Sequence, residues 1–314
     1  MTPRETDRRR EIETAILHTV LYADLFDYPL THNEIAHYLI GVEADAQSID
    51  DCLRAPIGLD GRLQECGGFV VTRGREALID CRRARQMSSA RLWSRARRFA
   101  RIVAALPFVR MIAVTGALAM DNSADGDDID VMIVTARGRA WTARLFTVAL
   151  VRLGKLFGDT LCPNYVITED ALALDERTLF TAHEYAQMVP VYGFSLYQRM
   201  CCANEWVYTH LPNARTPLKR EKETRTGPVG RLIKRMGEWL LRGELGDALE
   251  RWEMRRKLRK FALRITPASS VILDRNHVKG HFDDYSAPVL TLYAQRLAEF
   301  NRVDSEQHAF AISG

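Results

Sequence analysis

The N-terminal quarter of the chain changes from a helical to an extended hydrophobic pattern. Apolar residues recur at helical spacing over residues 11–22, and a second helix is expected after the capping box that Thr31 forms with Glu34. A short third helix is expected over residues 48–53. Residues 61–72 then contain two short apolar runs around a Gly-Gly turn, which is the pattern of a β-hairpin. This order predicts helices followed by a hairpin.

Three helices and a hairpin resemble a winged helix, a fold that often binds DNA. The third predicted helix presents Asp45, Asp50 and Asp51 with only Arg54 nearby. Binding to DNA phosphates requires cations at this position, so the charge disfavours a DNA-reading helix. We therefore expect the winged-helix-like region to serve in packing or protein contact, and DNA binding stays as the alternative.

An arginine-rich helix is predicted over residues 75–101. Leu92, Trp93 and Phe99 belong to its apolar stripe, and Pro107 ends the helical pattern. Arginines in such a run could face phosphates, but they more often form a solvated helix face, and we favour that interpretation. They are Arg82, Arg83, Arg85, Arg91, Arg95, Arg97, Arg98 and Arg101.

Two short apolar runs in the centre of the chain flank a candidate metal site. The first, residues 111–114, is followed by Gly116, and the second, residues 129–134, contains Asp130 and follows Asp128. Residues at i and i+2 of a strand point to the same face, so Asp128 and Asp130 would project together and repel unless a cation lies between them. An unpaired carboxylate inside an apolar run is costly to bury. A metal or basic partner is therefore favoured over a solvated strand end.

The order of strand, glycine turn, polar loop and Asp-x-Asp strand resembles the nucleotidyltransferases of the DNA polymerase β superfamily. The resemblance rests on the Gly116-Ala117 turn and on Asp128 and Asp130. It implies that Thr115, Gly116 and Ala117 bind a nucleoside triphosphate, and that Asp128 and Asp130 bind Mg²⁺ and are catalytic. Ala117 departs from the family, in which this position often carries a serine hydroxyl.

The family usually has a third metal carboxylate on a later strand, and residues 161–167 are the best candidate for that strand. This strand offers Asn164, which alternation would place on one face with Cys162 and Val166. Asn164 is therefore assigned to nucleotide binding, because an amide is a weaker magnesium ligand than a carboxylate. Two interpretations stay open: a transferase with two aspartates, or a nucleotide-binding domain that no longer transfers.

Other polar residues of the second half carry weaker signals. His183 and Glu184 are adjacent in a predicted helix and would point about 100° apart, so a helix-surface interpretation is favoured over an acid/base pair. Residues 219–264 carry 15 Lys or Arg against 7 Asp or Glu. Within them, residues 249–263 form a basic helix that could lie on anionic lipid or RNA, although packing with its cations in water is favoured. The basic segment 277–282 could reach a phosphate.

Composition excludes several classes of protein. No apolar run approaches the roughly 20 residues that a membrane-spanning helix needs, and the charged N-terminus lacks the apolar segment of a secretion signal. We expect a cytoplasmic protein and no strong membrane association. The six cysteines lack CxxC spacing, so neither a zinc site nor a disulfide framework is indicated.

These patterns together predict an α+β protein with a mixed-sheet nucleotidyltransferase core. The expected parts are a winged-helix-like domain (1–85), a linking helix (86–106), the core (107–212) and a C-terminal helical region (213–314). The expected reaction is Mg²⁺-dependent transfer of a nucleoside monophosphate from a nucleoside triphosphate to an acceptor hydroxyl. The alternative is a catalytically inactive nucleotide-binding adaptor or a winged-helix transcriptional regulator. The acceptor and the oligomeric state do not follow from the sequence.

Overall fold

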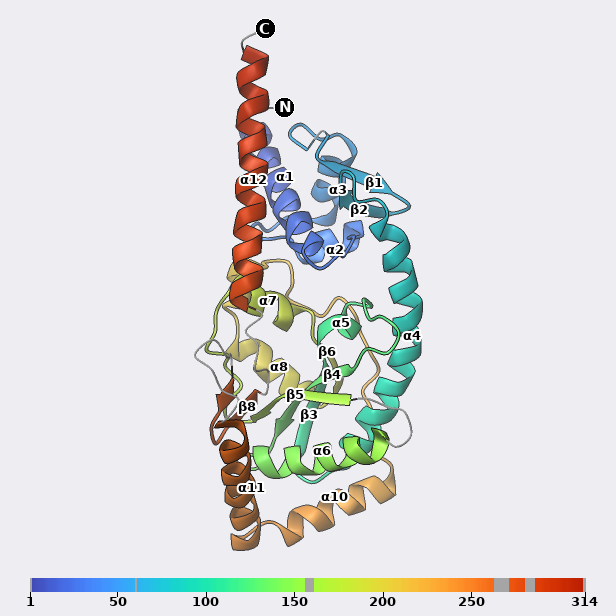
Figure 1. The fold of residues 1–314 in the computed structure, drawn as a ribbon, viewed down its shortest axis with the longest axis vertical. Coiled ribbons are helices and arrows are strands. Elements are labelled where there is room, and N and C mark those ends of the chain that lie inside the picture. Colours follow the sequence, from blue (N-terminus) through green and yellow to red (C-terminus); the bar gives the residue numbers. More distant parts are fainter. Residues whose placement is uncertain (1, 60, 156–160, 263–270, 280–285, 313–314) are drawn as a thin grey trace.

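The structure is a computed structural model that describes residues 2–59, 61–155, 161–262, 271–279 and 286–312. Its helices and strands form a mixed α+β fold (Figure 1), which confirms the predicted α+β class with a mixed sheet. The molecule is elongated, with the N-terminal helices and hairpin towards one end and the central sheet towards the other. Helix α4 (Leu78–Val103) connects the two parts along one side.

The N-terminal part contains the predicted helices and hairpin. Thr31 and Glu34 form the expected capping box, and a second capping box between Thr2 and Glu5 starts the first helix earlier than its apolar pattern indicated. Gly67 and Gly68 both have positive φ, as a two-residue hairpin turn requires. The elements are α1 (Pro3–Asp24), α2 (His32–His37), α3 (Ala46–Arg54), β1 (Leu63–Cys66) and β2 (Phe69–Thr72).

One arginine of α4 contradicts the interpretation of its arginines as a solvated face. Arg82 is only 2 % exposed and donates to Glu34 at 2.8 Å and to the carbonyl oxygen of Met120 at 2.8 Å. Its guanidinium also lies 3.8 Å from the ring centre of Tyr28. The buried charge is tolerated because Glu34 neutralises it, and the resulting contacts join the N-terminal part to the sheet domain.

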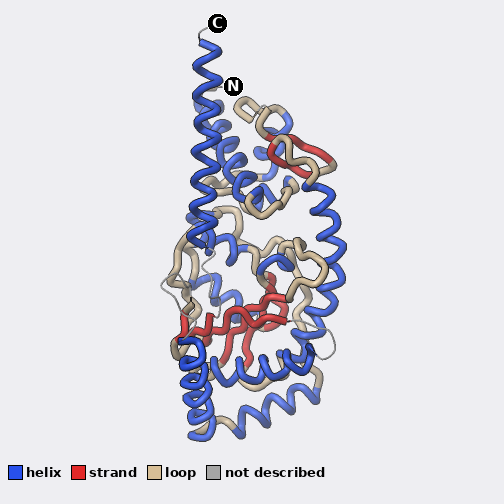
Figure 2. The backbone as a smooth tube through the Cα atoms, viewed as in Figure 1, coloured by secondary structure: helices blue, strands red, loops and turns tan. Residues whose placement is uncertain are grey.

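The central sheet has six strands within the described residues, in the order β6-β3-β4-β5-β8-β7. Figure 2 shows these strands in red, below the separate hairpin of β1 and β2. β3 and β4 are antiparallel, whereas β4 and β5 are parallel and are joined through helix α6 (Ala140–Lys155). The strands are β3 (Val109–Val114), β4 (Ile129–Thr135), β5 (Leu161–Thr168), β6 (Val189–Tyr192), β7 (Ile272–Leu273) and β8 (His277–Lys279).

Helices cover both faces of this sheet. On one face, α4 and α6 pack on side chains such as Val131, Ile133 and Val166, and α11 (Glu244–Ala262) lies against α6. On the other face, Met132 and Ile167 belong to the core that α7, α8 and α9 complete. These helices are α7 (Leu179–Ala186), α8 (Phe194–Ala203) and α9 (Val207–His210). Alternate side chains of β4 therefore pack into two separate hydrophobic cores, one on each face of the sheet.

The region predicted as C-terminal and helical also contributes strands. β8 pairs with β5 and β7 pairs with β8, so the segment covers what would otherwise be an open sheet edge. The region also contains α10 (Pro228–Leu240) and α12 (Ser286–Ile312). α12 returns along α1, where Tyr293 packs into the N-terminal core (Figure 1). No helix in the described part of the chain is long and apolar enough to cross a membrane.

Candidate functional site

The glycine turn after β3 lies against the carboxylate of Asp130. The turn leads from Thr115 into the short helix α5 (Gly116–Ala119), and Gly116 has φ +63°. A Cβ atom at Gly116 would lie 2.9 Å from Oδ2 of Asp130. The backbone N–H of Thr115 also donates to the carbonyl oxygen of Asp130 at 3.0 Å. Only glycine combines this backbone angle with this close approach.

A β-bulge on β5 directs Asn164 towards Asp130. Val131 pairs with Pro163 and Met132 pairs with Tyr165, so Asn164 is the extra residue between them. The side-chain amide of Asn164 donates a hydrogen bond to Oδ1 of Asp130. The predicted strand and the predicted proximity of its Asn164 to the acidic strand are both observed.

The bulge also corrects the expectation that Asn164 and Val166 share one face of β5. Val166 packs in the core on the α6 side, whereas Asn164 lines a cavity on the other side. Strict alternation fails here because a bulge adds one residue and shifts every later side chain to the opposite face.

Asp130 carries negative charge that its protein partners compensate only in part. Burial raises the pKa of Asp130 to about 6, the hydrogen bond from Asn164 opposes this rise, and the charges of Asp128 and Asp127 add to it. No ion pair to Asp130 occurs within the residues that the structure describes. Asp128 itself is exposed, directly before β4, and does not line the cavity. The site therefore has a half-buried carboxylate with further carboxylates beside it.

Asp130 lines a cavity of about 220 Å³ that several distant segments build together. Thr115 and Gly116 contribute the turn, Asn164 comes from β5, and Lys279 comes from β8. The Lys279 ammonium lies 3.6 Å from a carboxylate oxygen of Glu176, which also lines the cavity. Lys279 belongs to the basic segment 277–282, which we predicted from the sequence could reach a phosphate. The other residues of that segment after Lys279 lie outside the described part.

Glu184 was missed as a site residue, because its position on a helix indicated only an exposed helix surface. The residue as a whole is exposed, but it lines the cavity together with Asp130. Burial by the surrounding cleft raises the pKa of Glu184 to about 7, and the charge of Asp130 adds to the rise while Lys279 opposes it. The neighbouring His183 points away from Glu184 as expected, but the helix-surface interpretation is wrong for it, because His183 is buried and its ring centre lies 4.1 Å from that of Tyr22.

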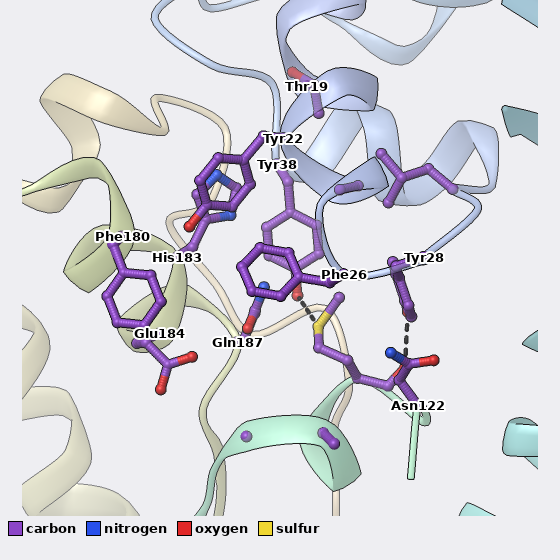
Figure 3. Close-up of a pocket in the computed structure, with 15 residues that line it drawn as sticks. Thr19, Tyr22, Phe26, Tyr28, Tyr38, Asn122, Phe180, His183, Glu184 and Gln187 are labelled. Carbon is purple, nitrogen blue, oxygen red and sulfur yellow. Dashed lines mark hydrogen bonds between the residues drawn. The ribbon is translucent and has the colours of Figure 1, made fainter. Parts of the chain in front are cut away.

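A second, aromatic cavity of about 170 Å³ adjoins the first one (Figure 3). The two share Gly116, Phe180 and Glu184 as lining residues, and Ala117 lines the second cavity only. In Figure 3, Tyr22 and Phe26 reach the cavity from the α1 side, and Phe180 and Glu184 reach it from the α7 side. The N-terminal part therefore supplies a wall of the candidate site, which its helical patterns did not indicate.

Hydrogen bonds connect two tyrosines that line this aromatic cavity to Met120. The Tyr28 hydroxyl donates to the carbonyl oxygen of Met120 at 2.7 Å, and the Tyr38 hydroxyl lies 3.3 Å from the sulfur of Met120 (Figure 3). Burial raises the pKa of both tyrosines, so their hydroxyls stay neutral at physiological pH. Met120 follows α5, and these contacts therefore connect the N-terminal helices to the glycine turn.

The structure brings together most of the predicted site residues. Thr115, Gly116, Asp130 and Asn164 line one cavity, whereas Asp128 stays outside its wall. Within the described segments, no group of three or more His, Cys, Asp or Glu side chains has an arrangement that could hold a metal ion. Comparisons of the chain with protein-family models, with curated proteins and with solved structures found no match.

Proposed function

We propose that the protein is a nucleotidyltransferase with a core of the DNA polymerase β type, preceded by a winged-helix-like region. The observation that carries this proposal is the contact of Asp130 with the Gly116 turn. It is supported by the order helix α4, strand β3, glycine turn, acidic strand β4, helix α6 and strand β5, with β5 beside the acidic strand. The part of this order from β3 through the glycine turn to β4 is the one on which the sequence resemblance to the superfamily rests.

The donor set around Asp130 fits a magnesium ion. Magnesium prefers oxygen ligands and is commonly bound through one or two carboxylates, several waters and substrate phosphates. Asp130 would hold the ion from the cavity wall, and Asp128 would hold it from its exposed position directly before β4, where its charge already raises the pKa of Asp130. When bound, magnesium supplies positive charge that offsets the charge of the reacting phosphates.

Lys279 and the glycine turn would position the phosphates. The Lys279 ammonium is a point charge in the same cavity as Asp130, and Glu176 holds it at 3.6 Å. The backbone at Gly116 can approach a phosphate closely because no side chain intervenes. Ala117 provides no hydroxyl. Binding of the phosphates would therefore depend more on Lys279 than it does in superfamily members that carry a serine at this position.

The aromatic cavity would hold the base of the nucleotide. Phe26, Phe180 and Tyr22 provide flat apolar surfaces next to the Gly116 turn. Aromatic side chains bind any nucleobase by stacking, which tolerates different bases. A base in this cavity would bring its triphosphate to the adjoining cavity through the lining that the two share.

Glu184 would accept the proton that the reaction releases. The oxygen of the acceptor hydroxyl forms a bond to the α-phosphorus, and its proton passes to a carboxylate oxygen of Glu184. The bond from the α-phosphorus to the bridging oxygen breaks, and its electron pair leaves with pyrophosphate. A carboxylate whose pKa is about 7 is well matched to take a proton at neutral pH. This role replaces the third carboxylate that β5 lacks.

A second candidate function is nucleotide binding without transfer. The observation that favours it is the hydrogen bond from Asn164 to Asp130, because an amide occupies the position where relatives carry a carboxylate. In that case the protein would be an adaptor or a transcriptional regulator. The exposed face of α3 does not favour DNA binding, because its acidic residue Asp50 would repel DNA phosphates. The basic groups nearby already contact Asp50, with His32 at 2.7 Å and Arg54 at 3.7 Å.

The test compares wild type with Asp130→Asn and with the control Asp80→Asn. Asp80 is an exposed residue at the start of α4 that lines neither cavity. Calorimetry with nucleoside triphosphates, with and without Mg²⁺, should show Mg²⁺-dependent affinity that Asp130→Asn lowers at least tenfold and Asp80→Asn preserves. Labelled nucleotide and a cell extract, followed by mass spectrometry, would then separate transfer from binding. Wild-type protein without Mg²⁺-dependent affinity would refute the transferase, and wild-type protein without any nucleotide affinity would refute both candidates.

A further inference from the structure

Helix α10 is attached to the domain by its polar side. Nζ of Lys234 donates to the carbonyl oxygen of Ala104 at 3.1 Å and to the hydroxyl of Tyr192 at 3.0 Å. The carboxylate of Glu238 accepts from the backbone N–H of Phe108 at 2.9 Å and from Arg110 at 2.6 Å. These contacts determine which side of the helix faces the protein.

Small residues on the same side let α10 approach closely. A Cβ atom at Gly237 would lie 2.3 Å from Cγ of Pro107, and one at Gly230 would lie 3.1 Å from Cβ of Ala105. Gly230, Lys234, Gly237 and Glu238 therefore form the attached side of the helix. Rotation of α10 would break the contacts of Lys234 and Glu238 and leave their charges without partners.

The apolar side of α10 consequently faces solvent. Its six large apolar residues are between 53 % and 73 % exposed, which is unusual for a helix of a folded domain. At about 100° per residue they occupy a single arc of roughly 120°. The residues of this apolar arc are Val229, Leu232, Ile233, Met236, Trp239 and Leu240. The helix lies at the end of the molecule beyond α6 (Figure 1), so the arc is open to a large partner.

Arginines border the apolar arc. Arg231, Arg235 and Arg242 are exposed; helical geometry places Arg231 and Arg235 along one edge of the arc, and Arg242 follows the C-terminal end of α10. None of these three forms an ion pair within the described residues, although Arg231 donates to the carbonyl oxygen of Thr226. Glu244 is an exposed acidic residue nearby, at the start of α11.

The exposed side of α11 continues the positive charge. Arg251, Arg255 and Arg259 are exposed there, together with Trp252 at 54 %. The opposite side of α11 is buried, since Glu253, Lys257 and Phe261 pack towards α6 and the sheet domain. The basic helix that the sequence indicated is therefore anchored by packing and contributes charge at this end of the molecule.

We propose that α10 binds the surface of an anionic lipid bilayer. An apolar arc with tryptophan, bordered by arginines, is the composition of helices that lie in the membrane interface. The arc would enter the boundary between headgroups and acyl chains, and the arginines would meet lipid phosphates. Figure 1 shows α5 and the glycine turn on the other side of the sheet from α10, so the candidate site would stay open to solvent on a bilayer. The proposal does not depend on the proposed enzymatic function.

Co-sedimentation of the full-length protein with vesicles tests this proposal. The vesicles contain phosphatidylcholine alone or phosphatidylcholine with 30 % phosphatidylglycerol, a composition that we choose for the test, at roughly 0.1 M and 0.5 M salt. We expect binding to the anionic vesicles that weakens several-fold at the higher salt, and weak or no binding to the neutral ones. Equally strong binding to neutral and anionic vesicles at both salt concentrations would contradict the role of the arginines.

Variants separate the helix from the rest of the surface. Trp239→Ser and the pair Arg231→Glu with Arg235→Glu should each lower vesicle affinity at least tenfold, while circular dichroism shows an unchanged fold because all three side chains are exposed. Ile57→Ser is the matched control, since Ile57 is 47 % exposed in the N-terminal part. Equal vesicle binding by wild type and Trp239→Ser would overturn the proposal. Absent vesicle binding, with a dimer in analytical ultracentrifugation that Trp239→Ser dissociates, would also overturn it and identify a protein interface.

Discussion

Gly116 and Asp130 lie so close together that a side chain at position 116 would push against the carboxylate, because a Cβ atom there would be 2.9 Å from Oδ2 of Asp130. We predict that Gly116→Ala displaces this carboxylate and lowers nucleotide affinity at least tenfold. Gly138 has nearly the same φ, +64°, but a Cβ atom there would meet nothing within 4 Å. Gly138→Ala should therefore cost a similar backbone strain of about 1 kcal/mol and leave binding unchanged. Urea unfolding and calorimetry measure the two effects, and equal loss of binding in both variants would argue against a specific role of the contact.

A carboxylate in place of Asn164 should strengthen cation binding. Asn164→Asp exchanges the hydrogen bond to Asp130 for a like charge, which raises the pKa of Asp130 further in the absence of a cation. A divalent cation would relieve this repulsion, so we expect several-fold tighter Mn²⁺ binding by electron paramagnetic resonance at pH 8. Asn164→Ala is the control, because it removes the amide without adding charge. Unchanged Mn²⁺ affinity in Asn164→Asp would show that this position does not border a cation site.

The charge of Glu184 should control the pH dependence of transfer. Its pKa is about 7 because the cleft desolvates it and Asp130 repels it, so the fraction able to accept a proton rises as the pH passes through 7. We expect the wild-type rate to increase between pH 6 and pH 8 and Glu184→Gln to be at least tenfold slower and flat above pH 7. Asp175→Asn, which changes another carboxylate of the same cavity that is exposed and does not hold Lys279, should keep the wild-type profile. A retained slope in Glu184→Gln would exclude Glu184 as the base.

His183 should make the protein sensitive to acid. Burial lowers its pKa from the ordinary 6.5 to about 3, and the charges of His210 and His37 add to this effect. Between pH 3 and pH 6.5, the unfolded chain therefore binds a proton at His183 that the folded protein does not bind. The free energy of unfolding consequently keeps its full value with respect to this group above pH 6.5 and decreases as the pH falls below 6.5. At pH 5 this costs roughly 2 kcal/mol. Because Nε2 of His183 has no hydrogen-bond partner within the described residues, His183→Phe should keep the stacking on Tyr22 and lose less stability than wild type between pH 7.5 and pH 5 in urea unfolding.

Phe26 should contribute to nucleotide affinity without contributing to stability. It is 40 % exposed and faces the aromatic cavity from the α1 side (Figure 3). Loss of one stacking surface is worth about 1–3 kcal/mol per base, so Phe26→Ala should weaken binding about fivefold or more. Ile57→Ala, at a similarly exposed position of the N-terminal part, should bind normally. Normal binding by Phe26→Ala would place the base elsewhere.

Local pattern was sufficient for the elements that build the site. The apolar run with Asp130 inside it, the glycine before it and the capping box of α2 are each encoded within about ten residues, and each is observed. The local pattern gave a wrong prediction where a contact between distant segments determined the environment of a residue. Arg82 was assigned to a solvated surface because it belongs to an arginine run, but Glu34 and Tyr28 bury it.

The sequence by itself determined strands β3, β4 and β5, the glycine turn and the acidic position, because periodicity and glycine act over a few neighbouring residues. Only the tertiary structure decided that Glu184 and Lys279 share a cavity with Asp130, that a bulge turns Asn164 towards it, and that α10 presents its apolar side to solvent. The reason is that these outcomes depend on which segments pack together. An amphipathic helix specifies two faces, and the contacts of its neighbours select the one that is buried.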